Sequence, residues 1–177
     1  NAIAGSSYWG LAANSSRFLM FAREYTGAVY LSDDGEIWDR VEDLPYPTGY
    51  AQKCWGASED YFVLGRNGTR YITVIDADTG INEAYLWPFT LGPRHIAWMP
   101  NIGQWLMVNQ SNEVGLTSDF VNWTTYTSAF SIEDMVFGDC LYAVSSGSTQ
   151  HGTYDGITWF NVATPTDYTT WSMAYAD

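Results

Sequence analysis

Basic residues are scarce in this chain. Seven Lys and Arg stand against 20 Asp and Glu, which gives a formal net charge of −13 at pH 7. A surface of that sign repels phosphate backbones and anionic lipid headgroups, and no Lys/Arg cluster offsets the repulsion. No apolar run approaches the roughly 18 residues that a membrane helix needs. The sequence therefore predicts no nucleic-acid partner and no membrane insertion.

Cysteine and histidine are equally rare. Cys54 and Cys140 each have apolar or aromatic neighbours, which favours buried free thiols over a disulfide bridge. His95 and His151 stand alone, far from each other and from any pair of cysteines. A zinc site, which needs clustered Cys and His ligands, is excluded.

Hydrophobic and aromatic residues are abundant. They make up 46% and 17% of the 177 residues, with nine Trp and thirteen Tyr, which is enough for the core of one ordinary domain. Short segments rich in Tyr, Val, Phe, Trp and Thr alternate with Gly, Asn, Asp, Ser and Pro clusters about every ten residues. This pattern is typical of antiparallel strands, and no segment has a convincing helical period.

The segments fall into repeats of about 40 residues, each with four expected strands, which is typical of propeller blades. We therefore predict an all-β fold, a β-propeller of about four four-stranded blades in a single domain spanning 1–177. The repeats and a last strand are expected at residues 6–46, 51–91, 94–130, 132–165 and 169–177.

The segment 169–177, TTWSMAYAD, resembles a fifth first strand, because Trp171 falls where Trp9, Trp55 and Trp98 fall in their repeats. Two interpretations remain open. Four blades close on themselves with this strand pairing to the first repeat, or the chain is part of a larger propeller whose next blade begins here. The start at Asn1, without Met, is compatible with a processed form, a domain of a longer protein or its ordered part.

A shorter motif recurs inside the repeats as YLSDDGEIW, GLTSDFVNW and HGTYDGITW, with Ser or Thr two residues before an Asp and Trp four residues after it. Asp side chains hydrogen-bond to nearby main-chain amides, and Gly permits the positive φ of a tight hairpin. The Ser or Thr hydroxyl adds a local hydrogen bond, and Trp covers the turn and seals the blade against its neighbour. The residues expected in these turns are Ser32, Asp34, Gly35, Trp38, Thr117, Asp119, Trp123, Thr153, Asp155, Gly156 and Trp159. In the second repeat, Asp78 and Gly80 are expected to hold the turn, with a longer spacing to Trp87.

These motifs resemble Asp-box (BNR-like) repeats, most like those of bacteriophage tail and fibre proteins. The resemblance implies a β-propeller, and it extends also to sialidases, other glycan-active enzymes, sorting receptors and assembly factors. Sialidase chemistry needs an arginine triad, a Tyr nucleophile with a Glu partner and about six blades. Four repeats without an Arg-Ile-Pro opening do not fit it, so no catalytic residues are expected.

Two further sets of residues are candidates for ligand contacts. The segment DADTGINE offers oxygen donors for calcium at Asp76, Asp78 and Asn82, although Trp87 stands where a calcium loop has its last acidic ligand. No cofactor is therefore expected. Aromatic residues in expected loops, which could stack on sugars, are Tyr46, Tyr50 and Tyr126.

The expected function is a non-enzymatic structural or adhesive domain of an extracellular particle, a phage tail or fibre protein. Its partners would be other protein subunits or further copies of itself, with a cell-surface glycan as a possible receptor, and its location extracellular or in a virion. The alternatives are a secreted glycan-binding lectin and a fragment of a larger glycan-processing enzyme. Incorporation in a large assembly would favour the particle subunit, and stabilisation of a monomer by sugar would favour the lectin.

Overall fold

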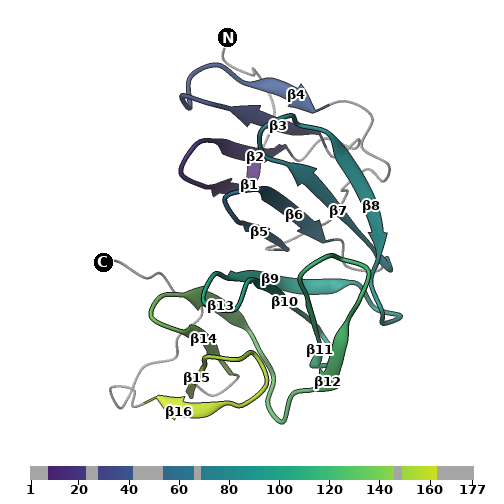
Figure 1. Cartoon of the computed structure of the whole chain (residues 1–177), viewed down its shortest axis with the longest axis vertical. Coiled ribbons are helices and arrows are strands. Elements are labelled where there is room, and N and C mark those ends of the chain that lie inside the picture. Colours follow the sequence, from purple (N-terminus) through teal and green to yellow (C-terminus); the bar gives the residue numbers. More distant parts are fainter. Residues whose placement is uncertain (1–7, 23–27, 42–53, 66–68, 146–148, 163–177) are drawn as a thin grey trace.

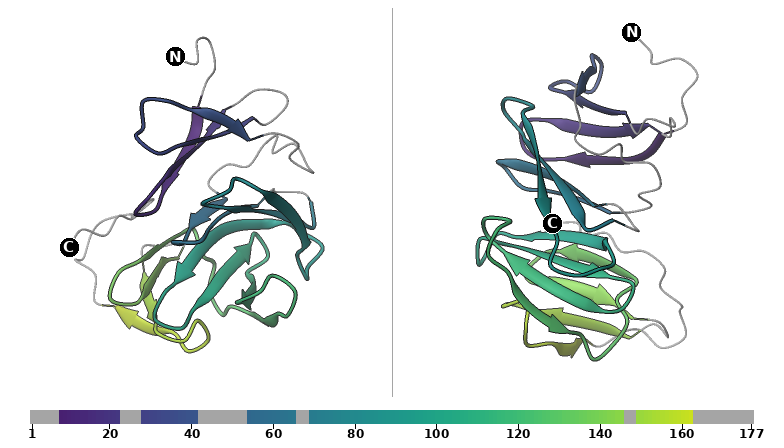
Figure 2. Two further views of the ribbon diagram at one scale, coloured as in Figure 1. Left: turned by 45° about the horizontal axis from the view of Figure 1, so that its top comes forward. Right: turned by 90° about the vertical axis from the view of Figure 1, so that its right-hand side faces the viewer.

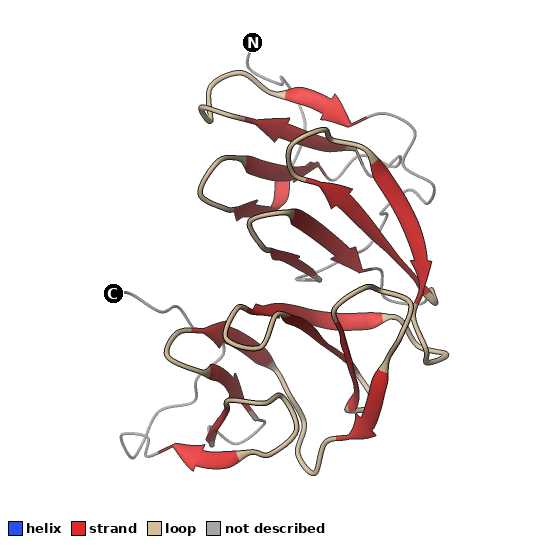
Figure 3. Ribbon diagram, viewed as in Figure 1, coloured by secondary structure: helices blue, strands red, loops and turns tan. Residues whose placement is uncertain are grey.

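The structure is a computed structural model that describes residues 8–22, 28–41, 54–65, 69–145 and 149–162. All regular secondary structure in these ranges is β-strand (Figure 3). The strands form four four-stranded antiparallel sheets, which confirms the all-β prediction. No helix able to cross a membrane was found among these residues. The expected strand 169–177 and the side chain of Trp9 lie outside the described part.

Each sheet is built from four consecutive strands in the order of the chain, and each is called a blade below. Blade 1 contains β1 (Tyr8–Ala13), β2 (Phe18–Ala22), β3 (Val29–Ser32) and β4 (Asp39–Val41). Blade 2 contains β5 (Trp55–Ala57), β6 (Tyr61–Gly65), β7 (Tyr71–Asp76) and β8 (Asn82–Leu86). Blade 3 contains β9 (Pro93–Met99), β10 (Gln104–Asn109), β11 (Glu113–Thr117) and β12 (Thr124–Thr127). Blade 4 contains β13 (Asp134–Phe137), β14 (Leu141–Val144), β15 (Gln150–Thr153) and β16 (Phe160–Val162).

Blade 1 lies at the top of Figure 1 and blade 2 below it, with blades 3 and 4 side by side in the lower half; Figure 2 shows the chain from two further directions. The first strands of neighbouring blades contact each other, β1 with β5, β5 with β9 and β9 with β13. Because every blade is an antiparallel meander, the turn between its first and second strands and the turn between its third and fourth strands emerge at the same end. These two sets of turns are called the turn face.

A separate apolar cluster fills each of the three interfaces between blades. In blade 1, Ala12, Leu19 and Leu31 lie opposite one another across β1, β2 and β3 and are buried in the cluster shared with blade 2. Blades 2 and 3 are covered on both sides, so β6 and β10 are buried along most of their length. This explains why their sequences are continuous apolar runs and do not alternate.

Both cysteines are free and buried, as their neighbours predicted. The Cys54 thiol donates to the carbonyl oxygen of Pro93 at 2.9 Å, and burial raises its pKa far above the ordinary value. A thiol that stays protonated is a poor nucleophile and a poor metal ligand. Cys54 is therefore part of the packing between blades 2 and 3.

Candidate functional site

The first motif forms a closed network of local hydrogen bonds. One carboxylate oxygen of Asp34 accepts the main-chain N–H groups of Glu36 and Ile37 at 2.8 and 2.9 Å. The Ser32 hydroxyl donates to the same oxygen at 3.1 Å and accepts the N–H of Gly35 at 2.8 Å. These bonds to the charged form lower the pKa of Asp34, with the N–H of Ile37 as the largest cause. The network uses one oxygen of the Asp34 carboxylate to hold the main chain of the turn in place.

The same network recurs in the other two copies, with Asp119 and Asp155 as acceptors and Thr117 and Thr153 as the hydroxyls. The N–H of Ile157 is the largest cause that lowers the pKa of Asp155 to about 2. The pKa of Asp119 is lowered still further, chiefly by the side-chain amide of Asn122. The three turns, 32–38, 117–123 and 153–159, are called the aspartate turns.

The residue after the aspartate has positive φ in all three aspartate turns, 76° at Gly35, 61° at Phe120 and 73° at Gly156. Glycine adopts this conformation without strain, whereas a side chain costs about 1 to 2 kcal/mol. Phe120 nevertheless occupies it, and only 5% of its surface is exposed. Its ring contacts Tyr61 and Tyr85 of blade 2, at centroid distances of 6.0 and 5.4 Å, and so fills the space between blades 2 and 3.

The tryptophans of the second and third aspartate turns reach back to the preceding blade. Trp123 meets Trp87 edge to face at a centroid distance of 5.1 Å. The indole N–H of Trp159 donates to the hydroxyl of Tyr126 at 2.9 Å, and that hydroxyl donates to the carbonyl oxygen of Gly156 at 2.6 Å. Trp38, in the first turn, donates to the carbonyl oxygen of Gly35 in its own turn at 3.1 Å.

Tyr126, a candidate sugar platform in the sequence, is thus engaged at the interface between blades 3 and 4. Burial is the largest cause that raises its pKa to about 12. The other two candidates, Tyr46 and Tyr50, lie outside the described residues.

The second repeat forms a different turn, and its aspartate is Asp76. One carboxylate oxygen of Asp76 accepts the N–H groups of Asp78 and Thr79 and the hydroxyl of Thr79, at 2.7 to 3.1 Å. Gly80 has the expected positive φ, 71°, but the prediction placed the turn carboxylate two residues too late, at Asp78. The turn between β7 and β8, residues 77–81, contains no tryptophan. Trp87 follows that strand, is fully buried, and donates to the carbonyl oxygen of Leu91 at 2.8 Å.

The calcium candidates also lie in this turn. Asp76 uses one carboxylate oxygen for the turn, and no group of three or more His, Cys, Asp and Glu side chains converges on a metal position within the described ranges. The arrangement of Asp76, Asp78 and Asn82 gives no support for a bound cation.

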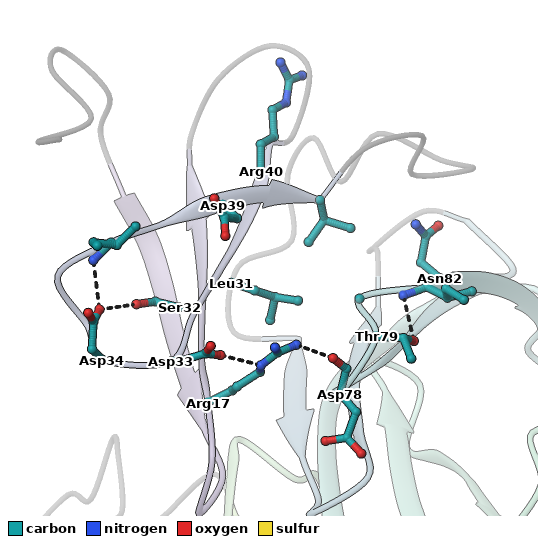
Figure 4. Close-up of a pocket in the computed structure, with 14 residues that line it drawn as sticks. Arg17, Leu31, Ser32, Asp33, Asp34, Asp39, Arg40, Asp78, Thr79 and Asn82 are labelled. Carbon is teal, nitrogen blue, oxygen red and sulfur yellow. Dashed lines mark hydrogen bonds and ion pairs between the residues drawn. The ribbon is translucent and has the colours of Figure 1, made fainter.

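A groove with a volume of about 750 Å³ lies on the turn face between the β3–β4 turn and the β7–β8 turn (Figure 4). Leu31 and Val41, both buried, belong to its lining, and so do Ile37 and Ile81, which are 65% and 66% exposed. Four carboxylates line it as well: Asp33, Asp34, Asp39 and Asp78.

Arg17 crosses between the two turns that border the groove. Its Nε donates to a carboxylate oxygen of Asp33 at 2.5 Å, and one terminal nitrogen donates to the carbonyl oxygens of Ala77 and Asp78, each at 2.7 Å. Sequence reasoning missed Arg17, Ile37 and Ile81 as contributors to a site. The available signals were the aliphatic residues at turn tips and the absence of a tryptophan before the fourth strand of the second repeat.

The fold is that of a β-propeller. No family model matches the chain, and no curated protein matches it. Among solved structures, the chain is similar to virginiamycin B lyase from Staphylococcus aureus, with a TM-score of 0.70 and 16% identity over 90% of this chain and 56% of that one.

It is also similar to a streptogramin B lyase, with a TM-score of 0.73 and 15% identity over 94% of this chain and 58% of that one. A third neighbour is Ycf48 bound to a D1 peptide, with a TM-score of 0.64 and 12% identity over 91% and 54% of the two chains. The chain spans little more than half the length of these three structures. Identities this low establish the fold alone.

Proposed function

We propose that this chain is an Asp-box propeller domain that serves as a non-enzymatic structural or adhesive part of an extracellular particle, such as a bacteriophage tail or fibre. It would work by presenting its turns and blade surfaces to protein partners or to a receptor. The proposed partners are other subunits or further copies of the same chain.

The aspartate turns support a non-catalytic role. Asp34, Asp119 and Asp155 each hold two main-chain amides and a hydroxyl, and their lowered pKa values keep them charged at neutral pH. A general acid needs the opposite, a carboxyl whose pKa is raised. These carboxylates are suited to fixing hairpins.

The observation that carries the proposal is the apolar surface at the two ends of the row of blades. In blade 3, Leu106 and Leu116 lie opposite each other in β10 and β11 and are buried in the cluster shared with blade 4. The corresponding positions of blade 4 are Tyr142 and Gly152, and Phe160 lies beside Gly152 in β16.

On this outer surface of blade 4, Phe160 stacks on Tyr154 at a centroid distance of 5.5 Å, and the two side chains are 40% and 60% exposed. At the other end, Leu11 in blade 1 is 57% exposed. Surfaces that interior blades bury are here open, and exposed aromatic patches are typical of interaction sites. We infer that further blades or subunits cover them, as in a larger propeller.

A binding role has separate support from one structural neighbour. Ycf48 is described as bound to a D1 peptide, so a propeller with a related fold can carry a peptide. This is the precedent on which we propose a protein partner for the present chain in preference to a sugar.

The mass of the particle in solution tests the proposal. Light scattering after size exclusion should give a multiple of the 19.8 kDa chain mass, and the double substitution Tyr154→Ser with Phe160→Ser should lower it. Val121→Ser, which removes an exposed apolar side chain from the turn face, is the matched control and should leave the mass unchanged. A monomeric wild-type chain that is stabilised by an oligosaccharide would contradict the proposal and favour the lectin alternative.

A further inference from the structure

We propose that the groove between the β3–β4 and β7–β8 turns binds a basic segment of a partner protein, with an Arg or Lys side chain placed along its apolar floor. The inference does not depend on the assembly proposed above, because it concerns the turn face and not the ends of the row of blades.

The groove exists because this blade interface lacks the closing side chains of the other two. Phe120 inserts its ring between blades 2 and 3, and Trp123 packs there against Trp87. Between blades 3 and 4, a Cβ added to Gly156 would lie 2.4 Å from a methyl group of Leu116, so the turn is already in close contact with blade 3.

At the interface of blades 1 and 2, the corresponding distance from Gly80 to Leu31 is 3.4 Å, and no tryptophan precedes β8. The volume of about 750 Å³ that remains is in the range of ligand pockets, roughly 300 to 1,000 Å³.

The negative charge of the turn face favours a positively charged ligand. Arg17 is the one basic residue in the eight turns of this face, all of which the structure describes. The acidic residues in or at the edge of these turns are Asp33, Asp34, Glu36, Asp39, Glu59, Asp60, Asp76, Asp78, Asp119, Asp139 and Asp155. Two arginines, Arg17 and Arg40, line the groove against the four aspartates named above, and Arg17 is paired with Asp33, so a net negative field remains over the groove. A cationic segment is attracted and an anionic one is repelled.

The apolar part of the lining favours an Arg or Lys side chain over a small inorganic cation. Leu31 and Val41 belong to the groove, and the largely exposed Ile37 and Ile81 come from the two turns that border it. An Arg or Lys side chain can lay its methylene groups on such a surface while its charged end reaches the carboxylates of Asp39 and Asp78. A small inorganic cation would gain nothing from the aliphatic residues.

Arg17 shows that the turns which border the groove can hold a guanidinium group. Its nitrogens bind one carboxylate of the first turn and two main-chain carbonyl oxygens of the second. A second planar group with several donors could bind the carboxylates of the lining that Arg17 does not use, whereas a sugar hydroxyl would leave most of their charge unmatched. The groove therefore favours a basic peptide over a neutral glycan.

Calorimetric titration with the peptide acetyl-Leu-Arg-Leu-Arg-Leu-amide tests the proposal. The wild-type chain should bind it, and raising the salt from about 0.05 to about 0.5 M should weaken binding strongly. The double substitution Asp39→Asn with Asp78→Asn should weaken binding by about tenfold or more, since both residues line the groove and carry charges opposite to that of the peptide. Ile81→Trp places a large side chain in the groove and should abolish binding altogether.

Matched controls separate the groove from the general charge of the face. Asp60→Asn with Asp139→Asn removes the same charge from turn residues outside the groove lining, and Val121→Trp adds the same ring to another exposed turn tip. Both should change the dissociation constant by no more than about twofold.

Equal weakening by the two double substitutions would overturn the proposal, because the peptide would then respond only to total charge. Binding of the Glu counterpart acetyl-Leu-Glu-Leu-Glu-Leu-amide or of maltotetraose, with none of the Arg peptide, would overturn it as well.

Discussion

The interface between blades 1 and 2 and the interface between blades 3 and 4 are built from equivalent strands, yet the first has a groove where the other is closed. At the closed interface, Trp159 and Tyr126 form a hydrogen-bonded pair, and Gly156 lies against Leu116. At the open interface, the turn of blade 2 is held by Asp76, and Arg17 spans the gap through polar contacts.

Strand pairing and blade closure therefore depend on different residues. All four blades pair their strands in the same consecutive order. Whether adjacent blades meet at the turn face depends instead on the turn between the third and fourth strands. A turn with tryptophan after it closes the interface to the preceding blade, and a turn without one leaves room for a ligand.

The largest expected effect comes from breaking the closed interface. Trp159→Ala removes an indole that packs on Phe130 and binds Tyr126, and should lower the free energy of unfolding by about 3 kcal/mol. Trp38→Ala removes an indole that bonds within its own turn and should cost about 1 kcal/mol. Urea denaturation of both variants measures the difference. Equal losses would show that contact with the preceding blade is not what distinguishes the two tryptophans.

An intermediate effect is expected at the interface between blades 2 and 3. Phe120→Gly loses a buried ring, which costs about 3 kcal/mol, but it relieves positive φ worth about 1 kcal/mol, so the net loss should be about 2 kcal/mol. The substitution should also enlarge the cavity of about 310 Å³ that Tyr61 and Tyr85 already line. Urea denaturation gives the energy and a crystal structure of the variant gives the cavity; an unchanged stability would mean that the ring does not hold these blades together.

The smallest effect is expected on the stability of the chain at low pH. The pKa of Asp155 is lowered to about 2 in the folded chain, below the ordinary value of about 3.9 in an unfolded one. The stability that follows from this shift is complete above about pH 4 and is lost as the pH falls toward 2. Because Asp155 is exposed, solvent screening keeps the contribution small. Melting temperatures measured from neutral pH down to about pH 2 should fall less for Asp155→Asn than for wild type; parallel curves would contradict the assignment.

The repeats carry enough information to predict the fold. Four strands per repeat and the fixed spacing from Ser32 to Trp38, from Thr117 to Trp123 and from Thr153 to Trp159 are local properties of the sequence. The second turn was misplaced because Asp76 and Asp78 stand two residues apart, and either carboxylate can organise a tight turn.

The groove could not be predicted in the same way. The groove forms because no large side chain fills the space between the β3–β4 turn and the β7–β8 turn, which are far apart in the sequence. The lack of a contact produces no periodic pattern in a sequence. The sequence does show Phe120 in place of glycine, but the direction of its ring is set by the neighbouring blade. The role of Tyr126 at the blade interface depends likewise on Trp159, 33 residues later.

The meander of each blade also bears on how the chain reaches its folded state. Every ladder joins strands that are neighbours in sequence, so a blade can form with short loop closures and low contact order. Coupling between blades then passes only from one neighbour to the next, as in other repeat proteins. The first strands contact each other least at the interface with the groove, between β1 and β5, so we expect blade 1 to open as a separate cooperative unit before the rest of the chain unfolds.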